Sequence, residues 1–234
     1  MTKEQFYHQC ELNGLILNEV QKKQLDQYLY LLQETNKVMN LTGITEENEV
    51  YEKHYYDCLL ASYHLDFENR SLVDVGTGAG FPGLVYAICY PNLNVTLVEP
   101  LTKRCNFLSK VKEDLNLNNV IIINERSEDF VKNARGKYDY ATARAVAKLN
   151  ILLEIITPLL KINGLFIALK GRQGEEELIE ASNAIKLLNL KVIDVKKTKL
   201  LTVEDERVNI YIRLINTISP KYPRAYSQIK KKPL

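Results

Sequence analysis

The stretch "DVGTGAGFPG", residues 74–83, holds the residue types and spacing best suited to binding a cofactor. Its glycines at positions 78, 80 and 83 match the Gly-x-Gly-x-x-Gly fingerprint of dinucleotide-binding loops. Glycine lets the backbone turn sharply and approach a ligand without an intervening Cβ, and Pro82 suits the first turn of a following helix. The free N–H groups of such a helix can hold several nucleotide-type cofactors.

Asp74, directly ahead of these glycines, distinguishes between the cofactors. A carboxylate beneath the turn repels a pyrophosphate, because like charges at close range raise the free energy, whereas it attracts an ammonium group. S-adenosylmethionine carries an ammonium and no phosphate. Glu99 lies 21 residues beyond Gly78, where a carboxylate can accept hydrogen bonds from both hydroxyls of a ribose. We therefore expect S-adenosylmethionine rather than NAD, and a loop that only makes a tight turn is the structural alternative.

Short β-branched runs alternate with helical patterns from residue 71 onward and predict an α/β fold, a doubly wound and mostly parallel sheet. Residues 1–65 are predicted to form an N-terminal helical extension, 66–216 the cofactor-binding domain and 217–234 a basic C-terminal tail. The last two strands should pair antiparallel at one edge. The expected strands are 71–75, 94–99, 119–124, 138–143, 164–170, 191–197 and 208–216, with helices that include one capped by Asn18 and others near 107–115, 149–160 and 175–189.

Ligands in such a sheet bind beyond the carboxyl ends of the strands. Besides the glycine loop and Glu99, this places four further side chains near the site: Ser127, Glu128, Arg144 and Lys170.

Composition and charge describe an ordinary globular protein with one basic end. Residues 1–185 carry a net charge of −6 and residues 186–234 a net charge of +8. A basic cluster attracts polyanions, so nucleic acid is a natural partner, although a solubilising tail is the alternative. No stretch is apolar enough to span a membrane, and the four cysteines and three histidines have no metal-site spacing. We expect a cytoplasmic protein with reduced thiols and no metal.

Several segments occur in an order that resembles the RsmG (GidB) family of bacterial methyltransferases. They are "NKVMNLTGI" (36–44), "EVYEKHYYDCLL" (49–60), "LVDVGTGAGFPG" (72–83), "RSEDF" (126–130), "TARAVA" (142–147), "NGLFIALKG" (163–171) and "KYPR" (221–224).

The resemblance implies a class I methyltransferase (Rossmann-like) fold. It also implies S-adenosylmethionine-dependent methylation of guanine N7 at one loop nucleotide of 16S ribosomal RNA in the small ribosomal subunit. The cofactor residues that it implies are Gly76, Phe81, Ser127, Glu128 and Arg144, beside Asp74, Gly78 and Glu99. The chain departs from the family pattern at Ser127, usually alanine, at Thr35, usually tryptophan, and after "KYPR", where the usual Gly and Pro are missing.

The segment "TARAVAKL" lacks the Asn/Asp-Pro-Pro-aromatic clamp of exocyclic-amine methylation and the cysteine that pyrimidine C5 chemistry needs. Guanine N7 carries a lone pair and no proton, so its methylation needs no general base. Arg144 and Lys170 are candidates for orienting the guanine or the cofactor, against the alternatives of a structural ion pair with Asp139 or another acid and of a solvated charge. His54, close to Asp57, is interpreted as a buried histidine rather than a catalytic one.

The basic tail and the last strand supply candidate RNA-binding residues: Arg207, Lys221, Tyr222, Arg224, Lys230, Lys231 and Lys232. A solvated surface is the alternative for each cation, and packing is the alternative for Tyr222. Two other functions stay open at this level, an NAD-dependent oxidoreductase and a non-catalytic RNA-binding ribosome-assembly factor. No long apolar surface stripe requires a second subunit, so we expect a monomer.

Overall fold

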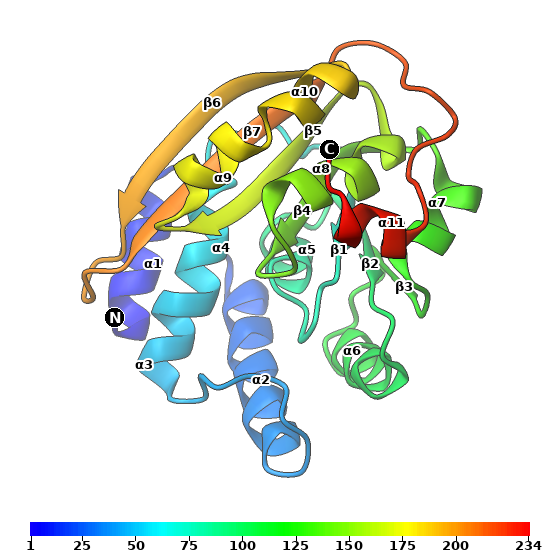
Figure 1. Cartoon of the computed structure of the whole chain (residues 1–234). Helices are drawn as coiled ribbons and strands as arrows, with labels where there is room; N and C mark the ends of the chain where they lie inside the picture. The colour runs from blue at the N-terminus through cyan, green and yellow to red at the C-terminus, as the bar shows by residue number, and fades with distance from the viewer.

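A computed structural model describes all residues, 1–234, and contains one seven-stranded sheet in the order β3-β2-β1-β4-β5-β7-β6 (Figure 1). Strands β1 to β5 are parallel, and β7 pairs antiparallel with both β5 and β6. This confirms the expected doubly wound, mostly parallel sheet with an antiparallel edge. The strands are β1 Ser71–Val75, β2 Asn94–Val98, β3 Val120–Ile123, β4 Tyr138–Arg144, β5 Leu160–Gly171, β6 Leu190–Lys199 and β7 Glu206–Leu214.

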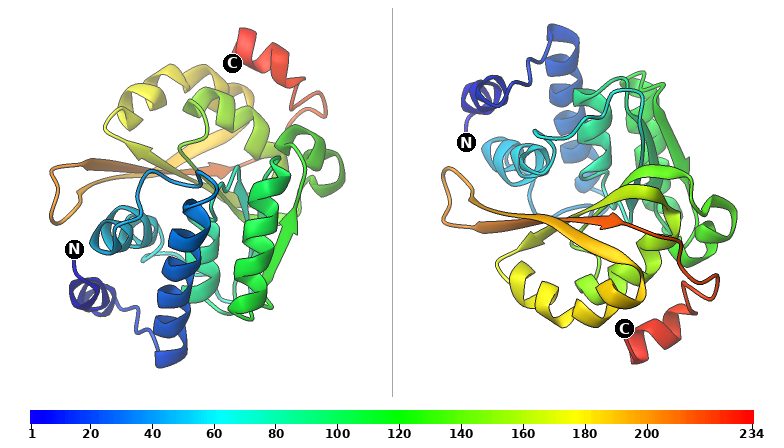
Figure 2. Two further views of the ribbon diagram at one scale, coloured as in Figure 1. Left: turned by 90° about the horizontal axis from the view of Figure 1, so that it is seen from below. Right: turned by 90° about the horizontal axis from the view of Figure 1, so that it is seen from above.

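Helices cover both faces of the sheet, and each face has its own hydrophobic core (Figure 2). On one face lie α1 Lys3–Leu12, α2 Glu19–Asn36, α4 Asp57–Leu60, α5 Gly83–Cys89 and α6 Thr102–Asp114. On the other lie α7 Ser127–Ala134, α8 Leu149–Ile156, α9 Gly174–Glu180, α10 Ser182–Leu187 and α11 Tyr226–Lys231. None of these helices is both long and apolar enough to cross a membrane.

The helix expected near 175–189 is instead two helices, α9 and α10. Ala181, at the junction, adopts φ −84° and ψ 3°, which interrupts the helical backbone. The bend lets the fully buried Ala181 and Ala184 both pack against the sheet core. Strand β5 also begins four residues earlier than predicted, because Leu160 pairs with Tyr138 ahead of the main run of the ladder.

The N-terminal helices are packed into the same core as the sheet. Asn18 caps α2 and forms a capping box with Gln21, as its sequence pattern predicts. After a loop, α3 Glu47–Val50, the π-helix η1 Tyr51–Tyr56 and α4 follow one another without a break. The Tyr86 hydroxyl of α5 donates to the Cys58 carbonyl at 2.9 Å, and the Tyr211 hydroxyl of β7 donates to the Ala61 carbonyl at 3.0 Å. These bonds fix α4 over the carboxyl end of the sheet.

Gly83, at the start of α5, lies against β1 so closely that a Cβ there would come within 2.8 Å of Asp74 Oδ2 and 2.3 Å of Leu97 Cδ2. We predict that Gly83→Ala lowers the free energy of unfolding by about 1–3 kcal/mol, because overpacking forces neighbours to shift. Urea denaturation with a common m-value measures this change. Gly43→Ala is the control, since a Cβ at Gly43 meets nothing within 4 Å; equal stability of the two variants would contradict the prediction.

Candidate active site

The main cleft, of about 820 Å³, opens at the carboxyl ends of the parallel strands. The glycine loop after β1, the ends of β4 and β5, the start of β7 and the N-terminal helices contribute its walls. Its volume lies within the range of small-molecule sites in proteins. Six of the residues singled out from the sequence line it, namely Gly76, Gly78, Phe81, Arg144, Lys170 and Arg207.

The glycine loop is open toward the cleft at one position. Gly78 has φ +62°, and a Cβ on it would meet nothing within 4 Å. Gly76 has φ +69°, and a Cβ there would lie 2.9 Å from the side chain of Val146, so the loop after β4 approaches it closely. The hydroxyl of Tyr28 donates to the Ala79 carbonyl at 2.6 Å. Helix α2 therefore holds the far side of the loop in place.

Asp74 supports this loop from below. Its side chain is fully buried, and its Oδ2 accepts hydrogen bonds from Thr77 Oγ1 at 2.6 Å and from the Gly83 N–H at 2.9 Å. Its Oδ1 is buried and has no hydrogen-bond partner. Burial raises the pKa of Asp74 to about 6, against the opposing effect of these two hydrogen bonds. Asp74 does not line the cleft, so its charge acts on a ligand from beneath the loop.

Glu99 fixes the loop from the neighbouring strand. Its Oε2 accepts from the Gly78 N–H and its Oε1 from the Leu101 N–H, both at 3.0 Å. The guanidinium of Arg104 lies 3.7 Å from Oε2. Each carboxylate oxygen can accept a second bond. Neither Asp74 nor Glu99 lines the cleft, so both carboxylates would act on a ligand through the glycine loop. Two negative charges behind the open side of Gly78 fit a cofactor with an ammonium group, as S-adenosylmethionine has.

Ser127 and Glu128 lie farther out. They form the first turn of α7, after β3, and neither lines the cleft. Their expected cofactor role stays a prediction. Further cleft residues had not been assigned a role from the sequence, among them Thr42, Lys53 and Val146. All three lie in segments of the family pattern, 36–44, 49–60 and 142–147, and tertiary packing brings these segments together at the cleft.

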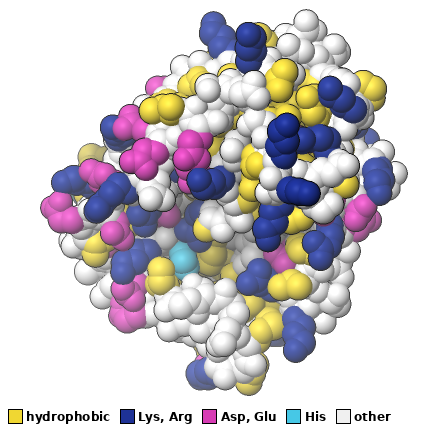
Figure 3. Space-filling view, in the orientation of Figure 1, with side chains coloured by type: hydrophobic (Ala, Val, Ile, Leu, Met, Phe, Trp, Pro, Cys, Tyr) yellow, Lys and Arg dark blue, Asp and Glu magenta, His cyan; other side chains and the backbone are white.

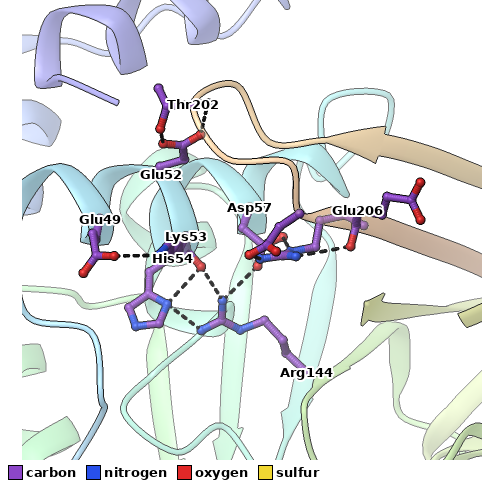
Figure 4. Close-up of polar contacts among 10 residues, drawn as sticks. Glu49, Glu52, Lys53, His54, Asp57, Arg144, Thr202 and Glu206 are labelled. Carbon is purple, nitrogen blue, oxygen red and sulfur yellow. Dashed lines mark hydrogen bonds and ion pairs between the residues drawn. The ribbon is translucent and has the colours of Figure 1, made fainter. Parts of the chain in front are cut away.

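Arg144, at the end of β4, is held by three acceptors (Figure 4). Its Nη1 donates to the Lys53 carbonyl and to Asp57 Oδ2, each at 3.1 Å, and its Nη2 lies 3.2 Å from His54 Nδ1. Its guanidinium also lies 5.1 Å from the ring centroid of Phe81, a cation–π contact. The ion pair that the sequence left open thus exists, but its partner is Asp57 and not Asp139.

His54 is buried beside Arg144, as expected, and is stacked on Phe81 at 4.3 Å between ring centroids. Its Nδ1 lies 3.2 Å from Arg144 Nη2 and 3.0 Å from the Lys53 carbonyl oxygen, and its Nε2 lies 3.0 Å from Thr42 Oγ1. Burial, together with the charge of Arg144, lowers the pKa of His54 to about 3. The imidazole is neutral at physiological pH.

Lys170, at the end of β5, is buried, and two of its three N–H donors are engaged. Its Nζ donates to Glu177 Oε2 and to the Ala147 carbonyl, each at 2.7 Å. Glu177 Oε2 also accepts from the Leu149 N–H. The solvated-charge alternative for Lys170 is therefore wrong, and the lysine orders the loop between β4 and α8, next to Arg144.

The candidate RNA-binding residues are distributed unevenly. Arg207 lines the cleft and pairs with Asp57. Arg224 instead forms a two-bond ion pair with the buried Glu154 of α8, at 2.7 and 2.6 Å. Tyr222 is only 5% exposed, so its ring packs in the core and cannot stack on a base. Four lysines of the tail are exposed, namely Lys221, Lys230, Lys231 and Lys232.

Charge on the face of the molecule that bears the cleft is asymmetric (Figure 3). Acidic side chains gather mainly over α9 and the β6–β7 hairpin, whereas Lys and Arg predominate over α8 and the C-terminal segment. A polyanion is therefore attracted to the cleft from the side of the tail.

The chain is similar to known proteins over its whole length. The family model of rRNA small subunit methyltransferase G, GidB, matches residues 21–206. The chain belongs to this family. Ribosomal RNA small subunit methyltransferase G of Brevibacillus brevis is 43% identical over 237 residues and covers 100% of both chains. Its counterpart in Bacillus subtilis is 42% identical and covers 100% of this chain and 99% of its own length.

Solved structures show the same fold at low sequence identity. M. jannaschii TYW2 in complex with AdoMet has a TM-score of 0.54 at 19% identity, and covers 68% of this chain and 75% of its own. The 16S rRNA (adenine(1408)-N(1))-methyltransferase of Catenulisporales acidiphilia has a TM-score of 0.53 at 15% identity, and covers 69% and 94%. This confirms the class I methyltransferase fold.

Family membership makes the chain an enzyme that methylates ribosomal RNA with S-adenosylmethionine. It confirms the expected enzyme class and cofactor, and it does not favour an NAD-dependent oxidoreductase or a non-catalytic RNA-binding factor.

The pKa of Asp74 leads to a prediction about stability. Because its folded-state pKa is raised to about 6, the proton it holds stabilises the fold fully below pH ~4, and this contribution is lost as pH rises through ~6. We predict that Asp74→Asn gains about 1–3 kcal/mol over the native chain between pH 4 and 7. Urea denaturation across this range measures the difference. The exposed Asp66→Asn should show no such trend. If the stability of Asp74→Asn and that of the native chain changed with pH in parallel, the raised pKa of Asp74 would be contradicted.

Glu99 leads to a prediction about binding. Glu99→Gln places an amide NH₂ against the N–H of either Gly78 or Leu101, so one backbone donor loses its acceptor. Because hydrogen bonds to charged groups are worth about 1.5–3 kcal/mol, S-adenosylmethionine should bind at least about tenfold more weakly. Isothermal titration calorimetry measures this. Exposed Glu125→Gln is the control at the same edge of the sheet; unchanged affinity for Glu99→Gln would refute the role.

Proposed function

We propose that the enzyme methylates the N7 atom of one loop guanine of 16S ribosomal RNA in the small ribosomal subunit. The observation that carries this proposal is the chemistry of the cleft, which offers cations and hydrogen-bond donors. Each of its three carboxylates lies beside a cation: Asp57 beside Arg144, Glu177 beside Lys170 and Asp205 beside Arg207. The only histidine at the cleft, His54, is neutral, and both of its ring nitrogens are engaged by Arg144 and Thr42.

Guanine N7 suits such a site. Its lone pair attacks a methyl group directly, and no proton has to leave, so a base is unnecessary. None of the four cysteines lines the cleft, and burial raises the pKa of every one of their thiols. The nucleophilic thiolate that pyrimidine C5 methylation requires is therefore missing. The segment after β4 also lacks the clamp that methylation of exocyclic amines uses.

Positioning then supplies most of the catalysis. S-adenosylmethionine, when bound, provides the methyl group on a sulfonium. Holding two reactants in line at near-attack distance lowers a barrier by roughly 7–11 kcal/mol. The buried framework around the cleft suits this task, because three protein groups hold Arg144 and two hold Lys170.

The position of each residue at the cleft or in the tail indicates whether it would contact the cofactor or the RNA. Asp74, Gly76, Gly78, Phe81, Glu99 and Arg144 would hold the cofactor, with Ser127 and Glu128 at its far end. Arg207 and the exposed tail lysines 221 and 230–232 would contact RNA phosphates, and the asymmetric charge beside the cleft supports this direction of approach. Arg224 and Tyr222 would act indirectly, because they anchor the tail to α8. We further propose that the enzyme acts as a monomer in the cytoplasm.

Mapping the methylated nucleotide tests the proposal. Small-subunit RNA from cells that lack this protein is incubated with enzyme and labelled S-adenosylmethionine, both as naked RNA and as assembled subunits. We expect the label at N7 of one unpaired guanine. Label on an exocyclic amine, on a pyrimidine or at many sites would overturn the proposed target, and absence of transfer to either substrate would overturn the proposed function.

A pH profile tests the absence of a base. Since the pKa of His54 lies at about 3 and that of Asp74, beneath the glycine loop, at about 6, neither group changes charge in the slightly alkaline range. We predict a single-turnover rate that is flat between about pH 7 and 8.5. Rapid-quench assays with saturating cofactor and RNA measure it. A rate that rises tenfold per pH unit in this range would show that a base takes part.

A further inference from the structure

Asp57 connects two cations that reach the cleft from different strands. Its Oδ2 accepts from Arg144 Nη1 at 3.1 Å and its Oδ1 from Arg207 Nε at 2.8 Å. Arg144 ends β4, whereas Arg207 lies on β7 opposite Gly171 of β5, so a whole strand separates them. One carboxylate on α4 thus spans three strands of the sheet (Figure 4).

The backbone that carries Asp57 is firmly placed. Asp57 follows the π-helix directly and begins α4, and the Tyr86 and Tyr211 hydroxyls donate to the carbonyls of residues 58 and 61, which follow it closely. A π-helical turn shifts the side chains that follow it relative to an α-helix, and such turns are frequent at functional sites. The carboxylate therefore has a fixed position over the sheet.

The three side chains are largely desolvated. Their exposed fractions are 7% for Asp57, 17% for Arg144 and 19% for Arg207. Breaking a buried pair is costly because it leaves an uncompensated charge, and here two guanidiniums depend on one carboxylate. Without Asp57 the two cations would repel each other and turn toward solvent.

Each guanidinium keeps free donors. Three of the five N–H bonds of Arg144 are used by Lys53, Asp57 and His54, which leaves Nε–H and one Nη2–H without a protein partner. Arg207 spends its Nε–H on Asp57, and one Nη1–H on the carbonyl of Glu206. Both residues line the cleft, so their remaining donors are available to a bound ligand.

We propose that Asp57 is a positioning residue for methyl transfer: it orients Arg144 beside the glycine loop and Arg207 toward the RNA, and it limits the positive charge that the cleft presents to RNA phosphates. Its role in RNA binding rests on the proposed function. The limit on positive charge follows because Asp57 places one buried negative charge between the two guanidiniums, while Asp205 lies 4.0 Å from Arg207 on the exposed side.

Asp57→Asn tests this proposal, with Glu206→Gln as the matched control. Both remove one negative charge, but the Glu206 carboxylate is exposed, lies 3.8 Å from Arg172 and does not line the cleft. Methylation kinetics are measured with RNA at several salt concentrations. For Asp57→Asn we expect kcat to fall by roughly 10- to 100-fold, because the guanidiniums shift. We also expect the slope of log KM against log salt to steepen by about 0.7–0.9, the value for one additional phosphate contact.

The control should keep kcat within about twofold of the native enzyme, as is usual for an exposed ion pair, and should keep its salt slope. A purely structural role for Asp57 would lower thermal stability without a steeper slope. The proposal is overturned if Asp57→Asn behaves like Glu206→Gln, or if its kcat falls while the slope stays unchanged.

An independent measurement covers the case in which Asp57→Asn does not fold. In ¹⁵N-arginine NMR spectra of the native enzyme, assigned with Arg144→Lys and Arg207→Lys, we expect hindered rotation of the Arg144 Nη groups and slow exchange of the Arg207 Nε–H. Free rotation and fast exchange in both residues would overturn the proposal. Because this readout needs no RNA, it separates failure of the Asp57 role from failure of the proposed methylation target.

Discussion

The two hydrogen bonds that Asp74 accepts, from Thr77 and from the Gly83 N–H, are the interaction on which the site depends. They join the end of β1, the glycine loop and the first turn of α5 through one buried oxygen. The contact is possible only because Gly83 has no Cβ, which would otherwise press on this carboxylate. Glu99 holds the Gly78 N–H from the side, so protein hydrogen bonds fix the loop from two neighbouring strands.

Burial of a carboxylate costs free energy, and the raised pKa of Asp74 is a sign of that cost. The second oxygen remains without a partner, which leaves an uncompensated negative charge under the loop. A cationic ligand relieves this charge, and an anionic one adds to it. The same feature that destabilises the free enzyme therefore favours a cofactor with an ammonium group, a relation between strain and function that is common at binding sites.

The other half of the site depends on the N-terminal helices. Helix α2 holds the glycine loop through Tyr28, and α4 supplies Asp57 and so orients the arginine after β4. A class I sheet by itself would present Arg144 without these acceptors. The helices at the start of the chain are thus a wall of the active site, packed into the same core as the sheet.

The sequence by itself determined the order of the seven strands, the glycine loop and the cofactor class. These follow from local patterns, since strand and helix periodicity, the capping box at Asn18 and the spacing of Asp74 to Gly78 and Glu99 depend on neighbouring residues. The bend at Ala181 was missed because both halves of that segment are helical, and only packing against the sheet separates them.

Tertiary structure alone decided the partners of the charged side chains. Asp57 and Arg144 are 87 residues apart, and Glu154 and Arg224 are 70 apart, so no local pattern relates them. The sequence could identify Arg144 as a site residue but not the acid that holds it, and it could not tell that Arg224 and Tyr222 face the protein instead of RNA. Charge and burial of a side chain depend on which distant segments surround it, and the folding of the whole chain determines those neighbours.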